Sequence, residues 1–329
     1  MRPFLVLIFS SSICVQIHAQ SLDTMELVNK QSILNGKAWF SFPASAKNVP
    51  RSVDIMSADH NANEETRIIM DLGDRRLVVF AKEIYTLGDK NLGEKLADKM
   101  NQFGYKTRQL MDKDSLVAII STPTTFDTSQ NAIPVNTLFV KTQDNTVFRI
   151  DAYINKPAMD KREGFQKLTE RIFHSLLKGT RTNQRNARTE TYPILHGKKS
   201  FVFALPEGYC VTLDEKYDFG VFKFHRYAAF GDTNWVSLTI YTGDYPSYFH
   251  NDYNLTDKDA ETTKGKFISK KVKWLNYRLP NSTTLLREQK IPYDEIEKGI
   301  IVHIAMMGNS QAGIDELSRI VENVKLIKE

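Results

Sequence analysis

Cysteine is nearly absent from this 329-residue chain, which contains only Cys14 and Cys210. If residues 1–19 are removed after export, one thiol remains and no internal disulfide can form. The chain therefore does not belong to the class of small secreted proteins that are held together by disulfides. Because the stretch around Cys210 has the character of a strand and free cysteine is usually buried, we expect this thiol to be buried.

Long apolar runs are also scarce, and the clearest one, Phe4–Val15, follows Arg2 and precedes the small residue Ala19. A basic start, a short apolar run and a small final residue are typical of a cleaved secretory signal. The run is shorter than the roughly 18 apolar residues of a membrane-spanning helix, and no later segment reaches that length. We therefore predict a signal peptide over 1–19 and a secreted or periplasmic mature protein without an integral membrane segment. The alternatives are a short N-terminal anchor and lipid attachment at Cys14, which the bulky residue before it disfavours.

A strong excess of one charge is lacking as well, since 44 Lys and Arg residues stand against 39 Asp and Glu residues. Proteins that bind nucleic acids gather basic residues on one face, so we expect no nucleic-acid partner. With 41% hydrophobic and 25% charged residues, the composition is that of a globular protein. The length favours two domains, because single cores stop growing near roughly 250–300 residues.

Motifs that carry known chemistry are missing too, including GxSxG, the Walker loop, HExxH and CxxC. Asp257–Glu261 resembles the start of a calcium loop, but Thr262 and Ile268 replace the glycine and glutamate that such a loop requires. We interpret the stretch instead as a solvated acidic turn or as a capping box between Thr256 and Asp259. The sequence therefore predicts no catalytic residue, no metal site and no cofactor.

An internal repeat is present. Residues 164–177 and 313–326 each place four apolar side chains at the spacing of one helical face. Their central leucines, Leu168 and Leu317, are 149 residues apart. We therefore predict two amphipathic helices that occupy equivalent places in two copies of one domain.

Earlier segments match at similar separations. The strand-like Phe40–Pro43 resembles Phe203–Pro206, 163 residues later. Gly-Asp turns at Gly73 and Gly231, each followed by a β-rich run, lie 158 residues apart. The decreasing separation is that of a duplicated domain with shorter loops in the second copy.

The order of the predicted elements indicates the fold class. In each copy, strands follow one another through short turns, and a helix comes only after a group of strands. This order is typical of a mainly antiparallel sheet with helices packed against it. We therefore predict an α+β protein of two duplicated domains, over 37–178 and 198–329, joined by a polar linker over 179–197. The first copy has a further helix at 91–103, and the second has a poorly patterned segment at 247–268.

The second copy carries the pattern best, in Phe203–Tyr209, the hairpin strand that contains Trp235 and the closing helix at 313–326. A strand ending in Phe-x-x-Pro, a hairpin, a helix, three strands and a closing amphipathic helix resemble the PsbP/Mog-type α/β fold and its secreted DcrB-like relatives. The resemblance covers about 37–178 and 198–329. It implies tandem domains of this type with binding or accessory roles, and no shared catalytic residues.

One stretch, residues 241–254, contains five large aromatic rings and a histidine without a helical or strand period. Rings in a loop can stack on sugars or anchor a partner protein, because they offer large contact area at a low cost in entropy. The alternative is that the rings fold back and cap the sheet. We predict a recognition surface for an unknown protein or carbohydrate ligand, formed by Tyr245, Tyr248, Phe249, His250 and Tyr253.

Two functional hypotheses follow from these observations. The first is a secreted or periplasmic, non-catalytic binding or accessory protein, such as an inhibitor or immunity-type partner of another protein. The second is a hydrolase whose catalytic residues are dispersed along the chain. A hydrolase would need a deep pocket that contains carboxylates with shifted pKa values or a pair of histidines.

Overall fold

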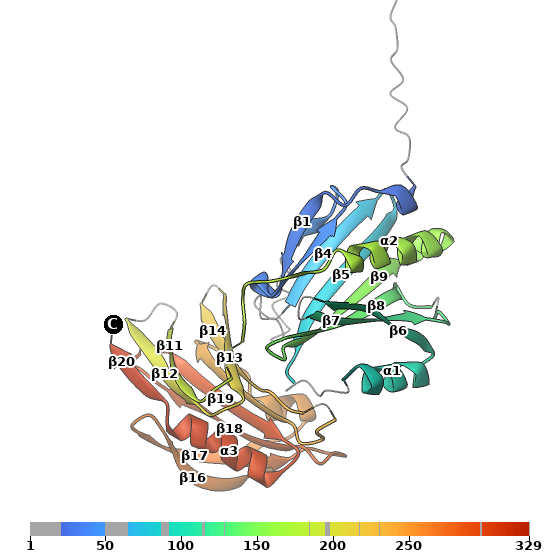
Figure 1. The fold of residues 1–329 in the computed structure, drawn as a ribbon. Coiled ribbons are helices and arrows are strands. Elements are labelled where there is room, and N and C mark those ends of the chain that lie inside the picture. Colours follow the sequence, from blue (N-terminus) through green and yellow to red (C-terminus); the bar gives the residue numbers. More distant parts are fainter. Residues whose placement is uncertain are drawn as a thin grey trace, which may run out of the picture.

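Each half of the chain in the computed structural model is built on a seven-stranded antiparallel sheet (Figure 1). The structure describes residues 21–328 apart from 50–64, 87–91, 114–115, 195–197 and positions 128, 184, 217, 230 and 297. The predicted signal peptide lies outside the described residues. Within the described part of the chain, no helix combines the length and the apolar character needed to cross a bilayer.

The two large sheets share one strand order. The first consists, in spatial order, of β3 (Lys47–Asn48), β4 (Glu65–Leu72), β5 (Arg75–Ile84), β9 (Val147–Asn155), β8 (Ala132–Thr142), β7 (Leu116–Pro123) and β6 (Tyr105–Lys113). The second consists of β13 (Tyr209–Lys216), β14 (Phe219–Arg226), β15 (Val236–Gly243), β19 (Ile301–Gly308), β18 (Leu285–Pro292), β17 (Lys270–Arg278) and β16 (Glu261–Phe267). Corresponding strands fill corresponding positions, as expected of a duplicated domain.

A three-stranded sheet accompanies each large one and repeats in the same way. The first contains β1 (Asn29–Ile33), β2 (Ala38–Phe42) and β10 (Leu177–Lys178), and the second contains β11 (Arg188–Pro193), β12 (Lys199–Leu205) and β20 (Lys325–Lys328). The last strand of each follows a closing helix, α2 (Arg162–His174) or α3 (Gln311–Glu322). Both predicted helices are thus confirmed, with ends that differ by two to four residues.

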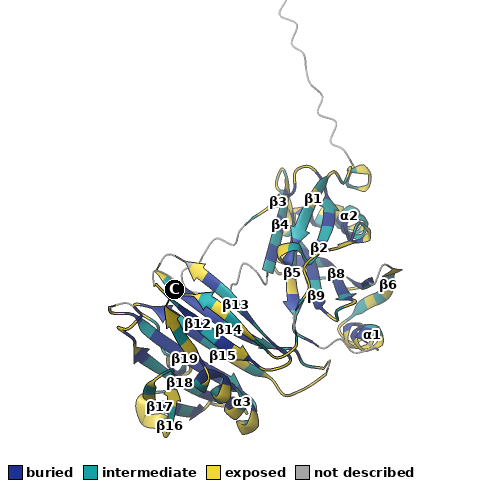
Figure 2. Cartoon of the chain, turned by 60° about the vertical axis from the view of Figure 1, so that its left-hand side comes forward, coloured by how far each residue is buried: buried dark blue, intermediate teal, exposed yellow. Residues whose placement is uncertain are grey.

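Each half has its own core (Figure 2). The closing helices contact strands of both sheets in their half, and Leu168 and Leu317 are completely buried there. Their helical periodicity explains this burial, since residues three and four positions apart form one apolar face.

The opposite face of each large sheet is covered differently in the two halves. In the first half, α1 (Leu92–Gln102) packs there through Leu92, Leu96 and Met100. In the second half the irregular residues 248–260 lie there, with the 3-10 turns η4 (Phe249–Tyr253) and η5 (Asp257–Asp259). The predicted capping box between Thr256 and Asp259 is confirmed at η5.

The predicted linker over 179–197 is wrong for residues 188–193, which form the edge strand β11 and pair with β12. Half-buried and exposed residues alternate along β11, and none of them is fully buried. The strand can therefore be made of polar residues, and its composition resembles that of a loop. The ring of Tyr192 nevertheless packs against Phe203 and Phe222, with ring centroids 5.7 and 6.0 Å apart. The Cys210 thiol, expected to be buried, belongs to a residue that is only half-buried on β13.

A fragment that begins at residue 186 is expected to be more stable than one that begins at residue 198. The shorter fragment lacks β11 and the packing of Tyr192, which is worth roughly 2 kcal/mol, the scale of one buried aromatic side chain. Urea denaturation of both fragments, followed by circular dichroism, measures the difference. Equal unfolding free energies would show that β11 is not part of the second domain's cooperative unit.

The segment between the halves is held at their junction. The guanidinium of Arg185 lies 4.1 Å from the centre of the Tyr227 ring and donates to the carbonyl oxygen of Thr86 at 3.2 Å. Beside it, Tyr85 stacks on His225 with ring centroids 4.0 Å apart. The chain therefore enters the second half from the junction.

Candidate functional site

The aromatic stretch leaves the sheet at a close approach of the chain to itself. A side chain at Gly243 would lie 2.5 Å from the Tyr241 hydroxyl and 2.8 Å from Cβ of Phe219. The rings of these two residues stack with centroids 5.4 Å apart, so there is little room to yield. Glycine at this position therefore fixes the point at which the chain turns away from β15.

Beneath the stretch, Glu288 of β18 acts as an anchor. Its fully buried carboxylate accepts hydrogen bonds from the backbone N–H groups of Phe249 and His250, each at 2.9 Å. Two ring nitrogens contact the same carboxylate, Nδ1 of His250 at 2.9 Å and Nε2 of His303 at 2.8 Å. Three of these four contacts fix residues 249 and 250 to the sheet, and the fourth comes from His303 of β19.

Glu288 is held in its charged form. Burial, the largest single influence, acts to raise the pKa of its carboxyl group. The hydrogen bonds from His303 and from the backbone of Phe249 and His250 outweigh burial, so the pKa lies below its ordinary value. Since a carboxylate only accepts hydrogen bonds, each imidazole must carry a proton on the nitrogen that faces Glu288.

The structure divides the five predicted recognition residues into two groups. Tyr245 is 91% exposed and Tyr253 is 40% exposed. Tyr248 and Phe249 are half-buried against the outer face of the sheet, and His250 is buried. Three of the residues therefore serve as anchors, in line with the fold-back interpretation, and two face solvent.

Tyr248 illustrates the anchoring role. Its phenol donates to Oε1 of Gln289 at 2.8 Å, and its ring centre lies 3.9 Å from the Lys290 ammonium. The same ring stacks on His250 with centroids 4.9 Å apart. A substitution at Tyr248 therefore disturbs the anchor as well as any recognition, whereas Tyr245 can be changed without loss of packing.

No group of three or more histidine, cysteine, aspartate or glutamate side chains that could hold a metal occurs among the described residues. Glu288 with His250 and His303 is the closest match to the constellation that a hydrolase would need. Its polar atoms face one another beneath the aromatic stretch rather than an open pocket. As folded, this cluster supports the structure.

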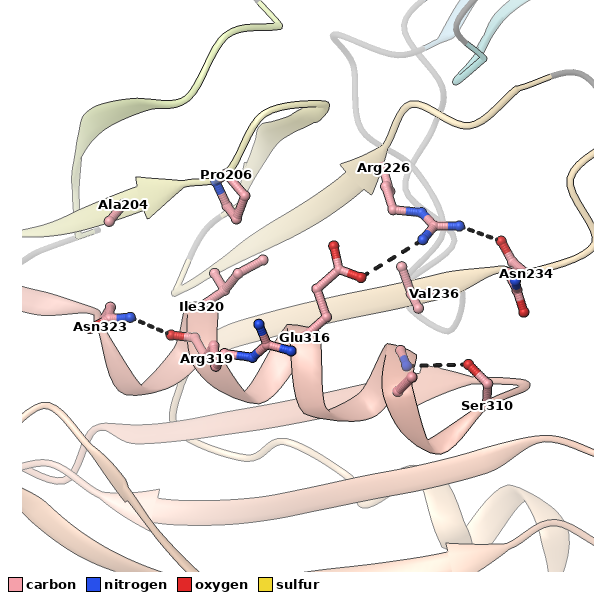
Figure 3. Close-up of a pocket in the computed structure, with 12 residues that line it drawn as sticks. Ala204, Pro206, Arg226, Asn234, Val236, Ser310, Glu316, Arg319, Ile320 and Asn323 are labelled. Atoms are coloured by element: carbon pink, nitrogen blue, oxygen red, sulfur yellow. Dashed lines mark hydrogen bonds and ion pairs between the residues drawn. The ribbon is translucent and has the colours of Figure 1, made fainter.

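A second candidate site is a groove along α3, which the sequence did not predict (Figure 3). Its volume is about 490 Å³. Its walls are α3, the end of β12 and the region that connects β14 to β15, with the lining residues Ala204, Pro206, Arg226, Asn234, Val236, Ser310, Ala312, Gly313, Glu316, Arg319, Ile320 and Asn323.

Charges of both signs lie in this groove. Arg226 donates to the carbonyl oxygen of Asn234 at 2.6 Å and lies 3.8 Å from the Glu316 carboxylate, a distance too long for a direct hydrogen bond. Arg319 is exposed and donates weakly, at 3.4 Å, to the carbonyl oxygen of Asp315 in its own helix. Glu316 and Arg319 can therefore both take a further partner.

Comparisons of this chain with protein-family models, with curated proteins and with solved structures gave no match.

Proposed function

We propose that this protein is a non-catalytic binding or accessory protein of the secreted or periplasmic space, and that it contacts its partner through Tyr245. The observation that carries this proposal is the 91% exposure of Tyr245, five positions before a residue fixed to Glu288. A ring on a segment that is already ordered loses little conformational freedom on binding, so more of the contact energy is retained. Tyrosine also combines a large apolar area with a hydroxyl group that can stay hydrated.

The partner is a protein or a carbohydrate surface that can receive an aromatic ring. The specific form that we favour is an inhibitor or immunity-type protein, in which the ring enters a cavity of another protein. The repeated strand order supports assignment of both halves to the PsbP/Mog-type, DcrB-like class, whose members have binding and accessory roles. The apolar run at the N-terminus supports export.

For the alternative, a hydrolase, the best-matching residues are Glu288, His250 and His303. A substrate could reach their polar atoms only by displacing the aromatic stretch, which the same atoms hold in place. The contacts of this cluster therefore favour the binding protein.

Tyr245→Ala is expected to weaken partner capture at least roughly 30-fold while leaving the melting temperature unchanged, since a central aromatic contact is worth about 2 kcal/mol or more. The wild-type protein serves as bait for proteins and glycans of the surrounding medium, and affinity for the captured partner is then measured for each variant. Phe103→Ala, at a phenylalanine that is 66% exposed in the first half, is the matched control and should bind normally. Unchanged affinity in Tyr245→Ala would contradict the proposal.

A further inference from the structure

The groove along α3 has a counterpart in the first half of the chain. Helices α2 and α3 align without a gap, so that Gly164 corresponds to Gly313 and Leu168 corresponds to Leu317. Leu22 covers α2 at the first of these glycines. A Cβ added to Gly164 would lie only 3.1 Å from the side chain of Leu22. At Gly313 the side chain of Val236 takes the place of Leu22, since a Cβ there would lie 2.6 Å from it, and the rest of the corresponding face of α3 lines the open groove (Figure 3).

Residues 21–28 are the segment that covers α2. The Lys167 ammonium lies 3.3 Å from the carboxylate of Asp23. Arg171 donates to the backbone oxygens of Asp23 and Met25, at 2.8 and 2.7 Å. One apolar side chain, one ion pair and two backbone hydrogen bonds thus hold this segment, which begins with the 3-10 turn η1 (Leu22–Thr24), against the helix.

The second half lacks such a segment because the chain takes another path. The strands β1 and β11 begin at corresponding places, where Asn29 pairs with Phe42 and Arg188 pairs with Leu205. Before Asn29 the chain runs over α2, whereas before Arg188 it comes from the junction where Arg185 is held. The groove along α3 therefore has no covering segment among the described residues.

We propose that this groove binds a short peptide segment of a partner protein, in the way that residues 21–28, with their 3-10 turn, lie on α2. Two exchanges define the segment that fits. Glu316 stands where α2 has Lys167, so the partner segment should carry a basic side chain at the place of Asp23. Ile320 stands where α2 has Arg171 and adds an apolar side chain to the floor of the groove. Arg319 beside it supplies donors for the backbone of the segment.

The groove and Tyr245 are independent sites. Helix α3 packs on one face of the second large sheet, and the aromatic stretch packs on the other. Peptide binding can therefore fail while the proposed contact through Tyr245 holds, and the reverse is also true.

Two fluorescent peptides test the proposal with the mature protein. One has the sequence of residues 21–28, SLDTMELV, and the other has lysine in place of its aspartate. Fluorescence anisotropy is expected to show the lysine peptide binding at least tenfold more tightly to the wild-type protein. In the variant Glu316→Lys, which gives the groove the charge that Lys167 provides on α2, the preference should reverse. The covalently attached segment on α2 is not displaced at micromolar peptide, because its effective concentration is on the order of millimolar.

Further variants separate the groove from other surfaces. Ala204→Phe, at an exposed position on the opposite wall, should fill the groove and abolish binding of the lysine peptide without changing α3. Asp315→Asn, on α3 but outside the groove, and Tyr245→Ala should leave peptide binding unchanged. The proposal is overturned if the lysine peptide does not bind, if both peptides bind equally, or if binding survives Ala204→Phe.

Discussion

Leu317→Ala is expected to lower the unfolding free energy of the second domain by about 2–5 kcal/mol, and Leu168→Ala should have the same effect in the first. Both leucines are completely buried at equivalent positions of the closing helices. Truncation removes apolar contacts and leaves a cavity between the helix and two sheets, which close packing prevents from collapsing fully.

Urea denaturation, followed by near-ultraviolet circular dichroism on each domain's own transition, measures these losses. Leu177→Ala is the matched control, because that leucine is 50% exposed and the same truncation there should cost under about 1 kcal/mol. A loss below about 1 kcal/mol at both Leu168 and Leu317 would mean that the two helices do not complete the cores of their domains.

The closing helices could be predicted because their burial is one-sided, which leaves a helical period in the sequence. The same holds for α1, where Leu92, Leu96 and Met100 recur every four residues and are all buried. Three edge strands cannot be predicted from the sequence, because they have no buried face that would leave a regular apolar pattern. β6, β11 and β16 lie at the ends of their sheets, and most of their side chains reach solvent, so their composition is that of a loop.

The irregular residues 248–260 could be recognised as aromatic but not placed. Their position depends on Glu288, which follows His250 by 38 residues and lies on a different strand. A contact of this separation leaves no period in the sequence. The burial of His250 follows from this contact, while Tyr245 five positions earlier is exposed, so residues that look alike in the sequence have different roles.

The groove along α3 depends on the path of the chain rather than on a motif. Its signal in the sequence was the pair of aligned helices, with Gly164 and Gly313 conserved between the copies and Lys167 exchanged for Glu316. The groove became recognisable only when the structure showed that residues 21–28 cover α2 and that Arg185 draws the corresponding segment elsewhere.

Glu288→Ala is expected to cost about 3–5 kcal/mol in the unfolding free energy of the second domain, because one partner of a buried, charged network is removed. Two backbone N–H groups and two imidazole nitrogens would lose their acceptor inside the protein. Glu288→Gln keeps the shape and one acceptor oxygen, so it should cost about 1–3 kcal/mol. Glu261→Gln, at an exposed position, should change stability by less than about 0.5 kcal/mol.

The pH dependence of this loss distinguishes a charged anchor from a packing effect. Because the pKa of Glu288 is lowered in the folded protein, its charge stabilises the fold above the ordinary value of 4.5, and this contribution is lost as the pH falls through the folded pKa. The difference in unfolding free energy between wild type and Glu288→Gln should therefore shrink as the pH falls below about 4.5. Asp257, 3.6 Å from His250, and Lys290 face the same cluster in both proteins. A difference that stays constant down to pH 3 would show that Glu288 stabilises the aromatic stretch through its shape and not through its charge.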